Sequence, residues 1–294
     1  MKPIAVIDLF CGMGGFSQGA IEAGAKVVLA VDLWEESLKV HYHNHPSTPI
    51  KRMTLGTKNQ FSLFMCEVQK WRKMGYHVHI HGSPPCQALS NASSRDPLEG
   101  MPLVIWFLDL VKFTKPDSWS MENVVPMRKR LPEGTPSVVL NSADYGVAQT
   151  RRRCIAGEGW EAIPTHNKET WLSVIDALPH LRKELGTHIN LDGATDSNSR
   201  RAKSADFDIN STSGTLRNNK PTLREIKLEA LGSNSNRKQD RTVQEPSKTI
   251  CGSGNQTGAR IFDHEKTKPK KIRSLTIEET LTLQGFDSKY NMTQ

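Results

Sequence analysis

The sequence predicts an α/β protein built around a parallel sheet, and two observations lead to this prediction. Short apolar runs of strand length alternate with segments whose apolar residues recur every three to four positions, which is typical of strands joined by helices. The first apolar run, residues 4–9, leads through a glycine-rich turn into a helical segment. With 294 residues, the chain can form one large domain or two smaller ones.

The elements of the first half follow in order along the chain. Residues 4–9 are almost continuously apolar, as in a strand that is buried on both faces. A helix is expected over 17–23 and ends at Gly24, because glycine readily adopts the conformation that closes a helix. A second buried strand over 26–31 and a helix over 34–42 come next. The further expected elements are strands over 50–53, 76–80 and 119–121, a strand and turn over 138–147, and helices over 61–74 and 102–113.

The turn after the first strand is a candidate ligand site. Gly12, Gly14 and Gly15 allow the backbone to approach a ligand closely, and the following helix begins with unpaired N–H groups. By itself the turn is compatible with a nucleotide, an adenosyl cofactor or no ligand at all. Asp32 stands at the tip of the second strand, where a carboxylate can accept both hydroxyls of a ribose. Together these residues favour a ligand that contains adenosine.

A cysteine follows a stiff turn at the end of the strand over 76–80. The segment Gly82-Ser83-Pro84-Pro85-Cys86-Gln87 has two adjacent prolines, which restrict the backbone and stop the strand. Open α/β sheets place their chemistry at such strand ends. A free cysteine is ordinarily buried and inert, and a nucleophile is the alternative. Glu122 and Asn123 end the next expected strand, and a carboxylate and an amide at that place favour the nucleophile.

Two further polar segments are candidates for substrate contacts. Residues 88–101 are small, polar and glycine-containing, so we expect a mobile loop that is long enough to act as a lid. A strand is expected to run from Gln149 into Cys154-Ile155-Ala156, with Gln149, Arg151 and Arg153 on one face. These side chains can reach a phosphate or brace a carboxylate, and a solvated basic edge strand is the alternative.

The composition fits an intracellular protein with a polyanionic partner. The formal net charge is +8, and basic side chains supply much of the affinity for phosphates, although many soluble proteins are mildly basic. No apolar run reaches the roughly 18–20 residues of a membrane span, and no signal peptide is visible. We expect no metal site, because His41, His43 and His45 are interpreted as a solvated helix end. The five cysteines, at positions 11, 66, 86, 154 and 251, form no disulfide or zinc pattern.

The character of the chain changes after residue 158. Over 159–240 the apolar periodicity fades and Gly, Asn, Ser, Lys and Arg are frequent, which predicts a smaller, looser domain that is basic enough to lie on nucleic acid. Helices are expected only over 171–178 and 223–231.

Regular structure is expected to return near the end of the chain. Residues 246–250 form a strand-like run. Thr276 and Glu279 form a capping box, in which each side chain bonds the backbone N–H of the other residue, and this pattern opens a helix. The helix runs to Gln284 and stops at Gly285.

Several of these segments resemble, in order and spacing, the motifs of the DNA (cytosine-5) methyltransferase family. The resemblance covers about residues 1–158 and 241–290, and several collinear motifs are far more specific than any one of them. The matching segments are Asp8-Leu9-Phe10-Cys11-Gly12-Met13-Gly14-Gly15, Pro85-Cys86-Gln87, Glu122-Asn123-Val124 and Gln149-x-Arg151-x-Arg153, followed by Arg241…Pro246-x-x-Thr249-Ile250 and Leu275-Thr276…Glu279…Leu283-Gln284-Gly285-Phe286.

The resemblance implies a Rossmann-like methyltransferase sheet with helices on both faces, plus a small irregular target-recognition domain. It implies a catalytic and cofactor-binding domain over 1–158, a target-recognition domain over 159–240, and a return to the catalytic domain over 241–294. It further implies a prokaryotic, cytoplasmic enzyme, of the restriction–modification or solitary type. Such an enzyme methylates cytosine in double-stranded DNA with S-adenosyl-L-methionine as cofactor.

The resemblance also assigns roles to individual residues. It implies that Cys86 attacks C6 of a cytosine flipped out of the duplex, and that Glu122 binds N3 and the exocyclic amine of the base. Arg151 and Arg153 are expected to brace the base and a neighbouring phosphate, and Asn123 is expected to order the site. The positions that match the cofactor site, or that line the same pocket, are Phe10, Gly12, Gly14, Gly15, Asp32, Pro85 and Leu103.

The sequence departs from the family pattern at two places. Met53-Thr54-Leu55-Gly56 offers no acidic residue after the third expected strand, where the family has one that contacts the adenine. The family's final Gly-Asn block is not found before the chain stops at Gln294, so we expect a fragment, a second polypeptide that supplies the block, or an impaired protein.

Other functions remain open on the sequence. One alternative is a tRNA cytosine-5 methyltransferase, although Gln87-Ala88-Leu89-Ser90 is close to the pattern of the DNA branch. Another is a non-catalytic or split DNA-binding subunit. A nicotinamide-dependent oxidoreductase would explain the glycine turn and would leave Pro-Cys-Gln and Glu-Asn-Val unexplained.

Overall fold

The computed structural model describes residues 2–85, 100–181, 225–230, 240–242, 247–248, 259–264, 269–287 and 289–291. The contacts divide the chain into two compact units. The first unit consists of Met1–Leu140, Arg153–Ala162 and Tyr290–Gln294, and the second of Asn141–Arg152 and Ile163–Lys289. These units differ from the expected ranges 1–158, 159–240 and 241–294, which stay a prediction about the roles of the segments.

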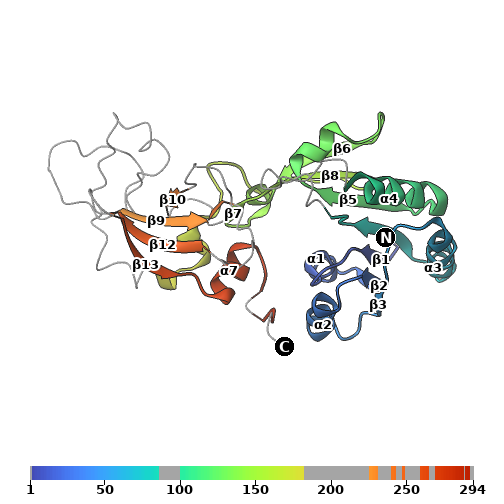
Figure 1. The fold of residues 1–294 in the computed structure, drawn as a ribbon, viewed down its shortest axis with the longest axis horizontal. Helices are drawn as coiled ribbons and strands as arrows, with labels where there is room; N and C mark the ends of the chain where they lie inside the picture. The colour runs from blue at the N-terminus through green and yellow to red at the C-terminus, as the bar shows by residue number, and fades with distance from the viewer. Residues whose placement is uncertain are drawn as a thin grey trace. The chain divides into compact units, whose positions relative to one another are not determined.

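A seven-stranded sheet forms the centre of the first unit, in the order β3-β2-β1-β4-β5-β8-β6 (Figure 1). Strands β1 to β5 are parallel, and β8 is antiparallel to β5. The strands are β1 (Ile4–Leu9), β2 (Lys26–Asp32), β3 (Ile50–Arg52), β4 (His77–Gly82), β5 (Ser118–Asn123), β6 (Ser137–Asn141) and β8 (Arg152–Glu158). The α-helices are α1 (Gly15–Glu22), α2 (Glu35–Asn44), α3 (Phe61–Lys73) and α4 (Met101–Thr114).

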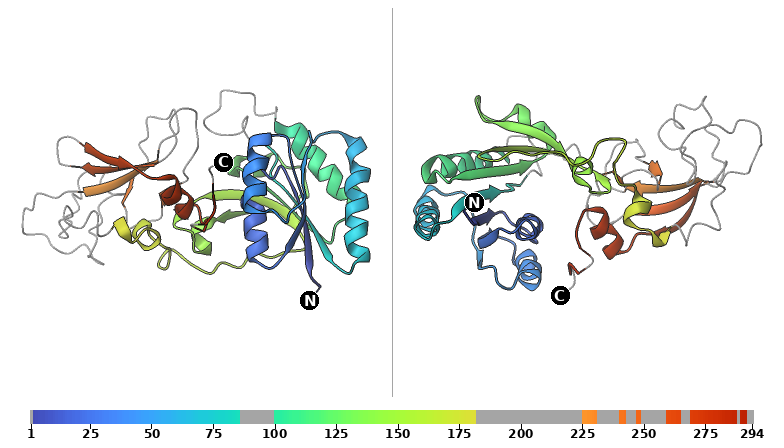
Figure 2. Two further views of the ribbon diagram at one scale, coloured as in Figure 1. Left: turned by 90° about the horizontal axis from the view of Figure 1, so that it is seen from below. Right: turned by 180° about the vertical axis from the view of Figure 1, so that it is seen from behind.

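Helices cover both faces of this sheet. In Figure 2, α1 and α2 lie on one face and α3 and α4 on the other. The strand order runs from β1 to β3 in one direction and from β4 to β5 in the other, and right-handed connections then place the helices on opposite faces. The apolar side chains of β4, Val78 and Ile80, are fully buried in a core to which α3 contributes Phe64 and α4 contributes Phe107. A side chain at Gly82 would come within 2.4 Å of the Phe107 ring, so this glycine allows α4 to pack close to the end of β4.

The α/β fold predicted from the sequence is confirmed, and most elements expected in the first half lie within one or two residues of their expected bounds. The loop expected over 88–101 falls almost entirely outside the described residues, because these resume at residue 100. In the described ranges no helix is both long and apolar enough to span a membrane.

The second unit contains a four-stranded antiparallel sheet in the order β10-β9-β12-β13. A second sheet pairs two short strands in parallel, and a buried cluster that includes Leu178, Leu181, Leu275 and Leu283 packs the helices. The expected capping box of Thr276 and Glu279 is confirmed. The elements are β7 (Gln149–Thr150), α5 (Val174–Ala177), β9 (Glu225–Ala230), β10 (Asp240–Thr242), β11 (Ser247–Lys248), β12 (Ala259–His264), β13 (Pro269–Ser274) and α7 (Ile277–Leu283).

One expected helix is wrong. Residues 223–231 were expected to be helical, and the structure instead has β9 at Glu225–Ala230, paired with β10 and β12. The sequence Glu-Ile-Lys-Leu-Glu-Ala alternates polar and apolar residues with the period of a strand. Glu, Lys, Leu and Ala each favour helices individually, and the pairing with two neighbouring strands overrides that preference.

The strand expected to run from Gln149 into residues 154–156 is also wrong as a single element. Strand β7 ends at Thr150 and pairs with β11, whereas β8 begins at Arg152 and pairs with β5. The chain therefore changes sheets at Arg151, a break that local alternation of residues does not reveal.

Candidate functional site

The carboxyl ends of the parallel strands bring the expected site residues to one edge of the sheet. Phe10 follows β1, Asp32 ends β2, Ser83 follows β4 and Glu122 is the penultimate residue of β5. Because β2, β1, β4 and β5 are neighbours in that order, these positions form a continuous row.

The glycine turn has the backbone geometry that its sequence requires. Phe10, Gly12 and Gly14 have φ values of 56°, 52° and 95°, which are left-handed conformations that glycine adopts without cost and phenylalanine does not. The Gly12 N–H donates to Asp32 Oδ2 at 2.9 Å, and the Trp34 N–H donates to Asp32 Oδ1 at 2.9 Å. Asp32 therefore ties the turn to the end of β2, and each carboxylate oxygen keeps a lone pair for a further donor.

A buried polar cluster lies beneath the glycine turn. Ser17 donates to Asp8 Oδ2 at 2.6 Å and also contacts His41 Nε2 at 3.0 Å. A side chain at Gly14 would come within 2.7 Å of the His41 ring and 3.1 Å of the His45 ring. His41 and His45 are 0% and 4% exposed, so the expected solvated helix end is wrong for these two histidines. The turn and Tyr290, whose ring lies 5.8 Å from that of His45, cover them.

Burial in this unit changes several pKa values in opposite directions. Burial, followed by a neighbouring histidine, lowers the pKa of His41 and of His79 to about 4 and that of His81 well below its usual value. Burial is also the main cause that raises the pKa of Asp8 to about 7. The histidines are thus neutral at neutral pH, and Asp8 titrates close to it.

The free energy of unfolding is expected to fall as the pH drops from 7 to 4.5. Histidines with lowered pKa values stabilise the folded state above pH 6.5 and lose this contribution as the pH falls towards 4; a shift of the size of that of His41 amounts to about 3 kcal/mol at most. Asp8 acts oppositely, because its raised pKa stabilises the fold below pH 3.8 and loses this contribution as the pH rises to about 7. Urea titrations at several pH values measure the sum. Asp8→Asn should make the acid-side loss steeper, and an unchanged slope would contradict the assignment.

The turn that precedes Cys86 is held at three points. The Ser83 N–H donates to the Leu9 carbonyl at 3.1 Å, which joins the turn to the end of β1. Asn123 Nδ2 donates to the Pro84 carbonyl at 3.1 Å, and the Val124 N–H donates back to Asn123 Oδ1 at 2.9 Å. At the third point, the Ser83 hydroxyl and His81 Nε2 are hydrogen-bonded at 3.0 Å. Asn123 is 1% exposed, and its side-chain amide both donates to and accepts from the backbone in this clamp. Cys86 itself lies outside the described residues.

The carboxylate expected at the strand end is paired with one of the two expected arginines. Glu122 Oε1 and Arg153 Nε are 2.8 Å apart, and the two side chains are 29% and 20% exposed. The antiparallel register of β5 and β8 pairs Glu122 with Ile155. Arg153 is two residues from Ile155, on the same face of β8, and is therefore the diagonal neighbour of Glu122. The expectation that Gln149, Arg151 and Arg153 share one strand face does not hold, since Arg151 lies between two strands. Arg151 belongs to the second unit, where its N–H donates to Ser142 Oγ at 3.2 Å, and its role stays a prediction.

The two remaining expected pocket residues lie on α4 and on the turn after β4. Leu103, on α4, would be 3.1 Å from a side chain at Gly56, so it packs against the backbone that follows β3. Pro85 is exposed, and its carbonyl lies 3.2 Å from the position that a side chain at Gly100 would occupy.

An aromatic residue at the same edge was not selected from the sequence. Trp34 is 62% exposed and lies two positions after Asp32, to which its N–H is bonded. It was assigned only to the start of a helix. Its place directly after an acidic strand end is a signal in the sequence, because an exposed aromatic ring beside a strand-end carboxylate can stack on a planar ligand.

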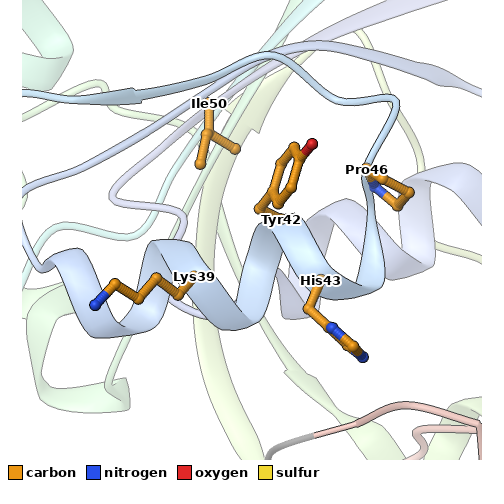
Figure 3. Close-up of a pocket in the computed structure, with 5 residues that line it drawn as sticks. All are labelled: Lys39, Tyr42, His43, Pro46 and Ile50. Carbon is orange, nitrogen blue, oxygen red and sulfur yellow. The ribbon is translucent and has the colours of Figure 1, made fainter. Parts of the chain in front are cut away.

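A cavity elsewhere in the first unit contains none of these residues. It has a volume of about 560 Å³ and is lined by Lys39, Tyr42, His43, Pro46 and Ile50, which come from α2, the connection after it and the start of β3 (Figure 3). Since β3 begins at Ile50, this cavity is near the amino end of the strand and not at the edge that carries Asp32.

The fold and the edge residues define an α/β protein in which a glycine turn and a strand-end aspartate share one sheet edge with a clamped turn that precedes a cysteine. The family model of the C-5 cytosine-specific DNA methylases matches residues 4–133 and 134–294, and the chain belongs to this family.

Individual relatives are similar over part of their length. Type II methyltransferase M.HindV of Haemophilus influenzae is 29% identical over 204 residues, which cover 63% of this chain and 63% of that protein. Type II methyltransferase M1.HphI of Haemophilus parahaemolyticus is 30% identical over 207 residues, or 61% of this chain and 53% of that protein. DNA (cytosine-5)-methyltransferase 1 of Gallus gallus is 28% identical over 184 residues, which cover 53% of this chain and 12% of that protein. The chain therefore spans less than two thirds of each of these relatives.

Proposed function

We propose that this chain carries out DNA cytosine-5 methylation with S-adenosyl-L-methionine, and that Cys86 is the nucleophile. The observation that carries the proposal is the arrangement at the end of β5. Asn123 clamps the carbonyl of Pro84, two residues before Cys86, while the adjacent Glu122 is paired with Arg153. One strand end thus fixes the cysteine-bearing turn and supplies a carboxylate beside it.

The proposed chemistry needs these residue types. C5 of cytosine is a poor nucleophile, and addition of the Cys86 thiolate to C6 moves the C5–C6 π electrons to C5. Glu122 binds N3 and the exocyclic amine, and a proton held between its carboxyl group and N3 neutralises the negative charge that develops on the ring as the thiolate adds. C5 then takes the methyl group, and the electron pair of the broken sulfur–methyl bond stays on the cofactor as a neutral thioether. Solvent water takes the C5 proton, and the C–H electrons re-form the C5–C6 double bond as the C6–sulfur bond breaks and returns the thiolate to Cys86. Arg153 holds Glu122 in place for this contact.

The groups at the glycine turn fit the proposed cofactor. A side chain at Gly12 would meet nothing within 4 Å, so the backbone there borders open space next to the Asp32 carboxylate. We assign Gly12, Gly14 and Gly15 to the methionine part, Asp32 to the ribose, and Phe10, Pro85 and Leu103 to the walls of the pocket. When bound, the cofactor supplies an electrophilic methyl group on a sulfonium.

The other described cysteines are poor competitors for the nucleophilic role. Cys11 and Cys154 are buried, and burial is the main cause that raises the pKa of each thiol. A raised pKa leaves almost no thiolate at neutral pH. Cys66 is exposed, and it lies on α3 away from the row of strand ends.

The substrate proposed is double-stranded DNA, read by residues 159–240 and methylated at a base flipped out of the helix under the loop over 88–101. The net charge of +8 supports a phosphate-bearing partner. The same proposal locates the protein in the cytoplasm of a prokaryotic cell.

A covalent trap tests the proposal. Duplex DNA libraries that contain 5-fluorocytosine are incubated with the protein and S-adenosyl-L-methionine, and complexes that survive a denaturing gel are sequenced. Fluorine at C5 cannot leave as a proton, so an adduct should accumulate on one sequence, and libraries with ordinary cytosine are the control. Binding of cofactor without any DNA adduct would contradict the DNA substrate, and a repeat with 5-fluorocytidine tRNA would then test the RNA alternative.

A further inference from the structure

A continuous row of histidines and serines runs along one face of β4 and β5 towards the cysteine-bearing turn. We call this row the histidine–serine ladder; it consists of His77, His79 and His81 on β4, Ser118 and Ser120 on β5, and Ser83. Five hydrogen bonds join it without interruption. They are His77 Nε2 to Ser118 Oγ (2.8 Å), Ser118 Oγ to His79 Nδ1 (2.7 Å), His79 Nε2 to Ser120 Oγ (2.8 Å), Ser120 Oγ to His81 Nδ1 (2.8 Å) and His81 Nε2 to Ser83 Oγ (3.0 Å).

The sheet register explains why these side chains meet. Alternate residues of a strand share a face, and the parallel pairing places His79 opposite Ser118 and His81 opposite Ser120. Phe16 of α1 covers the row, because its ring stacks on that of His81 with centroids 3.5 Å apart and planes 5° apart. His81, Ser118 and Ser120 are less than 8% exposed.

Around Ser120, the ladder has two proton arrangements that make both ring bonds and also use the hydroxyl hydrogen of Ser120. A neutral imidazole has one N–H donor and one acceptor nitrogen, and a serine hydroxyl has one hydrogen to give. If His79 donates through Nε2 to Ser120, then Ser120 must donate to His81 Nδ1 and His81 must donate through Nε2 to Ser83. The reverse order gives the opposite tautomer for both histidines. In the mixed order both rings donate to Ser120, and the buried Ser120 hydroxyl hydrogen then has no acceptor within the ladder, which is unfavourable. Burial, which lowers the pKa values of His79 and His81, keeps both rings neutral.

The end of the ladder coincides with the turn that the proposed function needs. Pro84 and Pro85 have no N–H, so the Ser83 amide, bonded to Leu9, is the last one before Cys86. The Ser83 hydroxyl is bonded to His81, and both ring nitrogens of His81 have partners. The opposite face of β4 carries Val78 and Ile80 in the ordinary apolar core, so packing alone does not call for a polar row here.

We propose that the ladder fixes the Ser83–Pro85 turn and so sets the position of Cys86, with His81 as a positioning residue that acts through Ser83. This inference rests on the proposed function for the role of Cys86. The hydrogen-bond order of the ladder and the rigidity of the turn can be measured without any methylation.

The first test is the tautomeric state of the ladder. Nitrogen-15 NMR of imidazole-labelled protein should show His79 and His81 in one common tautomer, because the Ser120 hydroxyl donates to one ring and accepts from the other. Ser120→Ala should remove this common state and leave each ring free to choose its own. Different tautomers for the two histidines in the unmodified protein would overturn the ordered ladder.

The second test compares two replacements of His81. Gln places its amide near the position of Nε2 and keeps the bond to Ser83, whereas Asn reproduces Nδ1 and loses it; both lose the stack on Phe16 equally. His81→Asn should speed hydrogen exchange of the Ser83 amide about fivefold, the factor that loss of one net hydrogen bond gives, and His81→Gln should not. His77→Asn breaks the far end of the ladder and is the matched control.

Methylation kinetics complete the comparison. His81→Asn should reduce kcat about tenfold with little change in the KM for DNA, because the nucleophile is displaced while the binding surfaces stay intact, and His81→Gln should recover most of the rate. Equal rates and equal Ser83 exchange in the two variants would overturn the positioning role. If the unmodified protein forms no adduct with either nucleic acid, the proposed function fails, whereas the exchange and tautomer measurements still decide whether the ladder holds the turn.

Discussion

Cys86→Ser is expected to abolish the covalent adduct with 5-fluorocytosine DNA and to reduce methyl transfer about 10⁴-fold or more. A serine hydroxyl is far less acidic than a thiol, so at neutral pH almost no alkoxide is available to add to C6. The cofactor should bind with unchanged affinity, because the glycine turn and Asp32 lie on other strands. Titration calorimetry of the cofactor and a filter assay of methyl incorporation measure the two effects separately.

Cys66→Ser is the matched control for this substitution. Cys66 is an exposed free cysteine on α3, so the same change there should leave both the adduct and the rate unaltered. A Cys86→Ser protein that still forms the adduct would show that another group attacks the base and would sink the proposed mechanism.

The sequence was sufficient for the parts of the fold that local patterns encode. The apolar runs at β1 and β2, the glycine turn and the capping box at Thr276 all depend on neighbouring residues, and each is present as predicted. The helix expected at 223–231 failed because its residues have helical preferences individually and strand alternation collectively.

The site residues divide in the same way. The positions of Asp32, Glu122 and Asn123 at strand ends follow from the alternation of strands and helices, which predicts parallel strands whose carboxyl ends share one edge. The burial of His45 does not, because Tyr290 covers it from a distant part of the chain. The ladder also depends on the register between two strands some forty residues apart, which no local pattern contains.

Glu122→Gln is expected to lower the rate of adduct formation and of methyl transfer by about 10²- to 10⁴-fold while the fold stays intact. Glutamine keeps the shape of the side chain, but its amide cannot give a proton to N3 of the activated ring as a carboxyl group can. The pair with Arg153 is partly exposed, so its loss should change the free energy of unfolding by at most about 1 kcal/mol. The measurement is the single-turnover rate on the trapped sequence, alongside urea unfolding of the same protein.

Glu67→Gln provides the comparison that separates catalysis from simple loss of charge. Glu67 also makes an ion pair, with Lys70 at 3.3 Å on α3, and it lies outside the row of strand ends. Its replacement removes the same charge and should leave the rate within about twofold of the unmodified protein, since surface ion pairs contribute little. If both variants methylate equally well, Glu122 has no part in activating the base. If both variants are equally slow, the lower rate reflects the overall charge of the unit and not a contact between Glu122 and the base. Asn123, bonded to the Pro84 carbonyl, is then the only one of these two residues of β5 with a part in the site.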